Sequence, residues 1–289
     1  MSCDYNQFMP RPHNLISDSA LVQETHQLAF ESGGRAAFIQ IAESVLRLSN
    51  ISVELATGLV CDLVENDPRF TIDGDCLVIS ADPLENCQLN EIDFVVVDVE
   101  AIGGRATPTR IIEIGACRVR AGEITEEFET LLNPDLPLPR FIAELTGITA
   151  EMLATAPKFP AVVESWLSFA ADSVIAAHNS DFDLSLLNQE INRVFPGSRM
   201  RNQEVCTVQL ARRTLPALDN HNLDALADHF GFEIKQRHRA AGDARATARV
   251  LSGLLDELEI HGVRTLAELR KFRRPNLELP NGAQLALDA

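Results

Sequence analysis

An apolar run that leads into two acids is the feature that most limits how this chain can fold. Residues 94–97 read Phe-Val-Val-Val, and Asp98 and Glu100 follow, two positions apart. A continuous apolar run is typical of a central strand that is covered on both faces. Because side chains alternate along a strand, both carboxylates leave by the same face and can share a cation. Unpaired acids beside a core are costly, so a metal site is favoured over a solvated strand end.

The residues after Ile92 predict an α/β domain. Residues 110–120 and 123–132 flank Ala121-Gly122 and predict an antiparallel hairpin, and residues 173–178 predict a short buried strand. Helical patterns occupy residues 141–145, 161–169, 182–194, 208–215, 223–230 and 240–258. We therefore expect a mixed sheet flanked by helices in residues 92–260.

A smaller α+β module is expected before this domain, in residues 35–80. Residues 38–48 and 52–65 have the spacing of amphipathic helices, and the segment around Asp73-Gly74 has the pattern of a hairpin. Two helices followed by a hairpin predict a winged-helix-like module. The remaining segments are expected to be a weakly ordered lead-in (1–34) with at best one short helical stretch around residues 20–30, a linker (81–91) and a C-terminal helix and tail (261–289).

The charge of the chain limits how it can meet nucleic acid. The net charge is −17, of which −9 falls in the first 90 residues. The second predicted helix of the module carries Glu54, Asp62 and Glu65 and no basic residue, which favours protein docking over nucleic-acid contact. A basic cluster near the C-terminus is interpreted as a solvated helix end rather than a phosphate contact; it comprises Arg270, Lys271, Arg273 and Arg274. Tight DNA binding without a partner is not expected.

Composition narrows the class of protein. A chain of 289 residues that is 46% apolar can bury one full core and a smaller one, so two domains are expected. The six cysteines form no CxxC pair, which indicates a reducing compartment and no zinc site. No apolar run approaches the length of a membrane span. These features predict a soluble cytoplasmic protein with no membrane partner.

Two further motifs supply acids, at Asp183 in HNSDFD and at Asp243 in HRAAGD. Asp183 is expected in the first turn of a helix, where the helix dipole favours an ionised carboxylate. Asp243 begins an alanine-rich helix whose small side chains permit close approach to the central strand. His238, five positions before Asp243, can take a proton from an attacking water. Four acids can hold two divalent cations, and this set suits phosphodiester hydrolysis.

These motifs, DxE, HNxxFD and HxxxxD in this order, resemble those of the DEDDh 3′-5′ exonuclease family, which includes the epsilon subunits of bacterial DNA polymerase III. The similarity covers about residues 92–260. It implies a ribonuclease-H-like fold, two Mg²⁺ or Mn²⁺ ions and a histidine general base. The resemblance assigns the metal ligands to Asp98, Glu100, Asp183 and Asp243, and the base to His238.

The resemblance also implies which residues contact the substrate. His178, Asn179 and Phe182 of the second motif are expected to bind it. One position departs from the family, because Ala101 stands where a threonine commonly follows the glutamate. The backbone amides of Ala101 and Ile102 can still contact the 3′ end, so the sequence predicts weaker binding of the substrate rather than inactivity.

The predicted function is a metal-dependent 3′-5′ exonuclease that releases nucleoside 5′-monophosphates, with DNA favoured and a role in proofreading or repair. Its expected partners are single-stranded or frayed 3′ ends and a polymerase or repair protein. Two alternatives stay open. One is an RNA-directed 3′-5′ exoribonuclease, and the other is a non-catalytic adaptor whose acidic module docks a polymerase or repair partner.

Overall fold

The computed structural model describes residues 12, 14–65, 67–104 and 107–274. Its larger part is built on a mixed five-stranded sheet with the strand order β10-β8-β5-β6-β7. The strands are β5 (Phe94–Gly104), β6 (Thr107–Arg120), β7 (Glu123–Leu131), β8 (Val174–Ala177) and β10 (Glu204–Cys206). β5, β6 and β7 pair antiparallel, whereas β8 pairs parallel with both β5 and β10. The predicted hairpin and the central place of β5 are confirmed.

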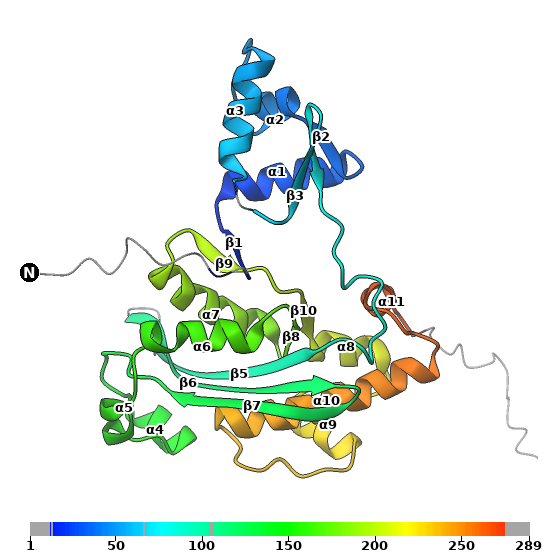
Figure 1. Cartoon of the computed structure of the whole chain (residues 1–289). Helices are drawn as coiled ribbons and strands as arrows, with labels where there is room; N and C mark the ends of the chain where they lie inside the picture. The colour runs from blue at the N-terminus through cyan, green and yellow to red at the C-terminus, as the bar shows by residue number, and fades with distance from the viewer. Residues whose placement is uncertain (1–11, 13, 66, 105–106, 275–289) are drawn as a thin grey trace, which may run out of the picture.

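Helices cover both faces of this sheet (Figure 1). One face carries α6 (Phe159–Ala170) and α7 (Ser180–Val194), and the other carries α8 (Thr207–Thr214), α9 (Leu223–His229) and α10 (Ala240–Ile260). β5 contributes to two cores because its side chains alternate. Val95 and Val97 pack in the core that contains Trp166, whereas Phe94 and Val96 pack in the core that contains Leu251. The apolar run is therefore buried on both faces, as expected.

A glycine on β6 allows α10 to lie directly against the sheet. A Cβ atom placed on Gly115 would lie 2.2 Å from the carbonyl carbon of Ala240 and from the backbone nitrogen of Ala241. Only a residue without a side chain permits this approach. Since Asp243 lies one turn further along α10, Gly115 determines how close that carboxylate comes to β5.

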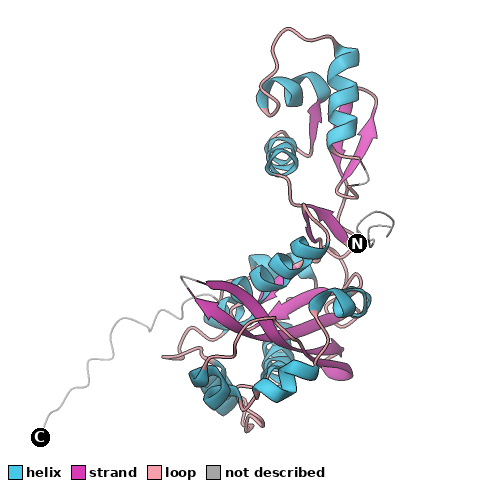
Figure 2. Cartoon of the chain, turned by 90° about the vertical axis from the view of Figure 1, so that its left-hand side faces the viewer, coloured by secondary structure: helices cyan, strands magenta, loops and turns pink. Residues whose placement is uncertain are grey.

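The N-terminal module (residues 14–79) contains three helices and a three-stranded antiparallel sheet of order β2-β4-β3 (Figure 2). Its elements are α1 (Ala20–Glu31), β2 (Arg35–Ala37), α2 (Phe38–Ser44), α3 (Val53–Leu63), β3 (Phe70–Asp73) and β4 (Cys76–Ile79). The predicted pair of helices and the hairpin at Asp73-Gly74 are present. The winged-helix assignment stays a prediction.

Much of the expected lead-in has regular structure from residue 15 onward. Residues 15–17 form β1 (Leu15–Ser17), which pairs with β9 (Ser198–Met200), and α1 follows. The helix, which the sequence indicated only as a short helical stretch around residues 20–30, is ordered because it buries Val22, Thr25 and Ala29 on one face. The rest of the predicted lead-in, residues 1–11 and 13, lies outside the described residues.

The predicted boundary after residue 260 does not coincide with the edge of the core. In α11 (Leu266–Lys271), Leu266 and Leu269 are buried in the same core as Phe94. The backbone N–H of Leu89, in the expected linker, donates to the carbonyl of Arg264 at 2.7 Å. The linker and the C-terminal helix therefore pack together on the larger domain. The predicted tail at residues 275–289 lies outside the described residues.

Two short helices, α4 (Arg140–Thr146) and α5 (Ala150–Thr155), follow β7. They pack on a small separate core that contains Ile102, Ile112, Ile148 and Leu153. This core supports the end of β5 just past the predicted acids. In the part of the chain that the structure describes, no helix has the length and apolar character needed to cross a membrane.

Candidate active site

Three of the four predicted acids form one group, the acid cluster: Asp98 and Glu100 on β5 and Asp243 on α10. Each offers a carboxylate oxygen, and these oxygens all lie within 4.8 Å of one another. Asp98 and Glu100 leave β5 on one face because they are two positions apart. Asp243 reaches them from the first turn of α10, where Gly115 lets the helix approach the sheet.

Asp183, the fourth predicted acid, lies beside the acid cluster on α7. Its Oδ1 accepts a hydrogen bond from the backbone N–H of Val99 at 3.1 Å, so it is anchored between the two acids of β5. Its carboxylate is among the charges that raise the pKa of Asp98. It occupies the first turn of its helix, as predicted, and Asn179 is at the N-cap position.

Burial is the largest effect on the pKa values of these acids, and repulsion between the carboxylates adds to it for Asp98 and Glu100. Burial, and then the charges of Asp183, Asp243 and Glu100, raise the pKa of Asp98 well above its usual range. Burial, and then the charges of Asp243 and Glu113, raise the pKa of Glu100 to about 7. The pKa of Asp183 is also raised to about 7, mainly by burial. A group with these properties binds protons or cations readily.

The donor set fits a hard divalent cation. Oδ1 of Asp243 is buried and has no hydrogen-bond partner, although its Oδ2 accepts from the backbone N–H of His238 at 3.2 Å and from Arg237. An unpaired buried carboxylate oxygen, close to two other carboxylates, is the ligand type that Mg²⁺ and Mn²⁺ prefer. Asp98, Glu100 and Asp243 can therefore hold such an ion, with Asp183 adjacent.

His238 lies in the loop before α10, next to the acid cluster. It is half-buried and has a positive φ of 63°, a backbone conformation that is uncommon for residues other than glycine. The loop is held by Glu113 of β6, which is fully buried. Glu113 accepts from Arg239 at 2.5 Å and from the backbone N–H of Ala240 at 2.9 Å. These contacts keep His238 at the start of α10.

Sequence reasoning missed two residues of this region, Arg237 and Glu113. Glu113 stands within an otherwise apolar strand, a position where a lone acid indicates a buried partner, so this signal was present in the sequence. Arg237 gave no such signal, because its contact with Asp243 depends on the conformation of the loop.

The predicted backbone contacts at Ala101 and Ile102 lie at an irregularity in β5. The pairing with β6 shifts between Glu100 and Ala101, and again after Ile102. A bulge of this kind re-aims the backbone beside a site. The side chain of Ile102 is buried in the small core, so any contact that it makes with a ligand must come from its backbone.

The predicted contacts of the second motif lie between β8 and the first turn of α7. His178 is half-buried, its Nδ1 is 3.0 Å from Oγ1 of Thr207, and burial lowers its pKa to about 4. Asn179 is exposed with a φ of 76°, and Phe182 is 52% exposed. The ring of Phe182 is therefore accessible, whereas His178 is a neutral hydrogen-bonding group.

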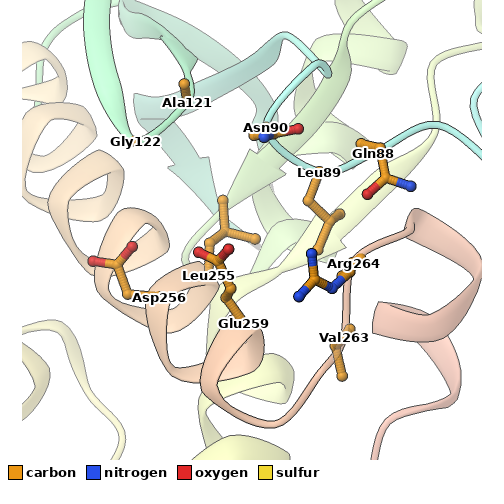
Figure 3. Close-up of a pocket in the computed structure, with 10 residues that line it drawn as sticks. All are labelled: Gln88, Leu89, Asn90, Ala121, Gly122, Leu255, Asp256, Glu259, Val263 and Arg264. Carbon is orange, nitrogen blue, oxygen red and sulfur yellow. The ribbon is translucent and has the colours of Figure 1, made fainter.

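A separate pocket of about 310 Å³ lies between the β6–β7 turn, the end of α10 and the segment before β5 (Figure 3). It is lined by Gln88, Leu89, Asn90, Ala121, Gly122, Leu255, Asp256, Glu259, Val263 and Arg264. None of the predicted site residues lines it.

This part of the chain is similar in sequence to an exonuclease family and to several named proteins. The family model described as Exonuclease, of RNase T type, matches residues 95–251. A Mycobacterium tuberculosis protein named as a bifunctional exonuclease/endonuclease is 41% identical over 213 residues, which are 70% of this chain and 32% of that protein. The epsilon subunit of DNA polymerase III from Aquifex aeolicus is 38% identical over 165 residues, 57% of this chain and 81% of the subunit. The chain thus spans about a third of the first relative and most of the second.

Two solved structures share the fold. The nuclease domain of 3′hExo, described as a DEDDh family member bound to rAMP, matches with a TM-score of 0.50 and 18% identity over 61% of this chain and 95% of that domain. Exonuclease I of E. coli in complex with a dT13 oligonucleotide matches with a TM-score of 0.50 and 20% identity over 60% of this chain and 43% of that one. These matches confirm the expected ribonuclease-H-like fold. The chain therefore belongs to the RNase T exonuclease family.

Proposed function

We propose that this chain is a metal-dependent 3′-5′ exonuclease that releases nucleoside 5′-monophosphates. The observation that carries the proposal is the acid cluster, whose three carboxylates lie within 4.8 Å of one another beside Asp183. Acids this close and at least partly buried are destabilising unless cations or protons compensate them. Family membership supports the same reaction class.

In this proposal the acids hold two Mg²⁺ or Mn²⁺ ions. When bound, the ions would polarise the phosphodiester and lower the pKa of an attacking water. Asp98 and Glu100 hold their positions because β5 is buried on both faces, and Asp183 is fixed by the N–H of Val99. His238, which is half-buried at the edge of the acid cluster, takes the proton of the attacking water.

The 3′ end of the substrate is proposed to lie over the end of β5 and the start of α7. The backbone amides of Ala101 and Ile102 donate to the terminal sugar in place of the missing threonine hydroxyl. Phe182 stacks on a base, because its ring is half exposed. His178 and Asn179 contribute uncharged hydrogen-bonding groups, consistent with the lowered pKa of His178.

DNA is the favoured substrate, because the Aquifex aeolicus relative, of which the chain covers 81%, is named as a DNA polymerase III subunit. A net charge of −17 leaves little electrostatic affinity for a polyanion. We propose that a polymerase or repair protein supplies the missing affinity. The cytoplasm is the proposed location.

Strand degradation tests the enzyme proposal and the substrate preference together. DNA and RNA oligonucleotides of the same sequence, labelled at the 5′ end, are incubated with the purified chain and Mn²⁺ or Mg²⁺. We expect a ladder of products shortened from the 3′ end, formed faster on DNA. A faster reaction on RNA would establish the exoribonuclease alternative, and products that shorten from the 5′ end would contradict the proposed polarity.

The N-terminal module supports a second proposal, that it docks a protein. α3 carries Glu54 and Asp62 with no basic residue, and Val53 and Leu55 are each 54% exposed. An acidic helix with exposed apolar side chains suits a protein partner better than a phosphate backbone.

If the chain were only an adaptor, its acids would have no need to hold metal. Calorimetric titration with Mn²⁺ separates the two functions. The enzyme proposal predicts binding that disappears in Asp183→Ala, whereas an adaptor predicts no binding in either protein.

A further inference from the structure

A basic side chain contacts the acid cluster. Arg237 precedes His238, and its Nη1 forms an ion pair with Oδ2 of Asp243. Its Nε lies 3.4 Å from Oδ1 of Asp224, an exposed acid on α9. The Arg237 side chain is 35% exposed and that of Asp243 only 5%. One guanidinium therefore joins a buried site carboxylate to a surface carboxylate.

The charge of Arg237 acts on more than one acid of the site. Burial raises the pKa of Asp98, Glu100 and Asp243, and the charge of Arg237 opposes this rise at each acid. It is also among the charges that lower the pKa of His178. A single positive charge therefore lies close to the whole site and partly neutralises it.

The same position is unfavourable once divalent cations are present. A guanidinium a few ångströms from a divalent ion is repelled by it, and the repulsion is large where solvent is partly excluded. The ion pair also occupies Oδ2 of Asp243, which leaves only Oδ1 without a partner. Asp224 offers Arg237 a second anchor outside the acid cluster.

We propose that Arg237 is the internal counter-cation of the metal-free site and competes with the divalent ion for Asp243. When a metal ion binds, Arg237 leaves Asp243 and stays paired with Asp224 at the edge of the site. Arg237 thus sets the metal concentration at which the site fills. This inference rests on the proposed metal-dependent function and deepens it by naming what restrains metal binding.

Metal titration tests the competition. At about pH 8.5, where protons compete little with metal for carboxylates of pKa about 7, Arg237→Gln is expected to lower the apparent Kd for Mn²⁺ about tenfold, which corresponds to about 1.4 kcal/mol. Arg237→Lys keeps the charge but not the planar guanidinium that contacts both Asp243 and Asp224, and it is expected to lower the Kd less. Arg245→Gln is the matched control, because Arg245 pairs with the exposed Glu127 and should leave the Kd unchanged.

Thermal unfolding supplies a second readout that does not depend on activity. In EDTA, Arg237→Gln should melt below the wild type, because the buried acids lose their counter-charge. In saturating Mn²⁺ the difference should shrink, since the metal replaces the lost charge. A merely structural arginine would lower both melting temperatures equally, and that result would overturn the proposal.

The outcomes distinguish this inference from the function on which it rests. If the wild type binds Mn²⁺ and Arg237→Gln binds it equally or more weakly, the competition is wrong and the metal site stands. If neither the wild type nor Arg237→Gln binds Mn²⁺, both the competition and the proposed enzyme function fail. Only tighter binding by Arg237→Gln, with Arg245→Gln unchanged, supports the inference.

Discussion

At the scale of single residues, the site combines two opposite electrostatic tendencies. Burial and mutual repulsion make the carboxylates of Asp98 and Glu100 prefer protons, whereas the guanidinium of Arg237 favours their charged forms. Burial is the largest effect on each of these acids, so their pKa values stay raised although Arg237 opposes the shift. The metal-free protein is therefore expected to respond to pH around neutrality.

The raised pKa values lead to a prediction about stability. In the folded protein the pKa of Glu100 and of Asp183 is about 7, against ordinary values of 4.5 and 3.8. The folded state then binds more protons than the unfolded state in this range, so these groups stabilise it at acid pH and lose that contribution as pH rises to about 7. In EDTA, differential scanning fluorimetry should show that Glu100→Gln flattens the fall in melting temperature between about pH 5 and about pH 8. An equal fall in both proteins would contradict the shifted pKa of Glu100.

His238 is predicted to act in the chemical step and not in metal binding. Replacing it with alanine should lower kcat about 10²- to 10⁴-fold, the usual contribution of a general base. Mn²⁺ binding should persist, because the contact of His238 with Asp243 is made by its backbone N–H. His229→Ala, at an exposed position on α9, serves as the control. An unchanged kcat in His238→Ala would exclude the base assignment.

At the scale of elements, the close contact between β6 and α10 is what brings Asp243 to β5. Gly115→Ala places a Cβ 2.2 Å from backbone atoms of Ala240 and Ala241, so α10 must shift or the protein must lose stability. We predict a marked fall in melting temperature together with weakened Mn²⁺ binding.

Gly58→Ala is a matched control for that substitution. Gly58 lies within α3, and a Cβ there would meet nothing within 4 Å. This variant should be more stable than the wild type by about 0.5–1 kcal/mol. If Gly115→Ala melts and binds Mn²⁺ like Gly58→Ala, the packing account of the site is wrong.

The elements also show how far the sequence could be read. β6 and α10 were predicted over most of their length, because their patterns extend over many residues, whereas β5 was predicted from its four-residue apolar run alone. β1, β2, β9 and β10 were missed, since each is three residues long and depends on a partner strand from elsewhere. The site acids were predicted from their motifs. The Arg237–Asp243 pair was not, because it follows from positive φ angles at Gln236 and His238 that no pattern reveals.

At the scale of the whole molecule, the net negative charge disfavours binding of the substrate that the site is proposed to cut. The net charge of −17 disfavours a polyanionic substrate, whereas the site contains the acids that its proposed metal ions require. The N-terminal module adds to the negative charge and is joined to the larger domain through the pairing of β1 with β9. In α3 of this module the exposed side chains are apolar, as in Val53 and Leu55, or acidic, as in Glu54 and Asp62.

This arrangement predicts that the module does not take part in hydrolysis. Leu55→Glu adds a charge to an exposed position of α3 and should leave the rate on a free oligonucleotide within about twofold of the wild type, as surface substitutions usually do. Steady-state kinetics on single-stranded DNA measures this. A much larger KM in Leu55→Glu would show that α3 meets the substrate and would contradict the protein-docking proposal.

The most direct test of the account is the release of nucleoside 5′-monophosphates from single-stranded DNA by the wild type and by Asp98→Ala. The account predicts steady release with Mn²⁺, none in EDTA, and a loss of at least about 10³-fold in Asp98→Ala, because an unliganded site forfeits the stabilisation that metal ions provide. Equal rates for the two proteins, or a wild type that leaves the strand intact with Mn²⁺, would contradict it.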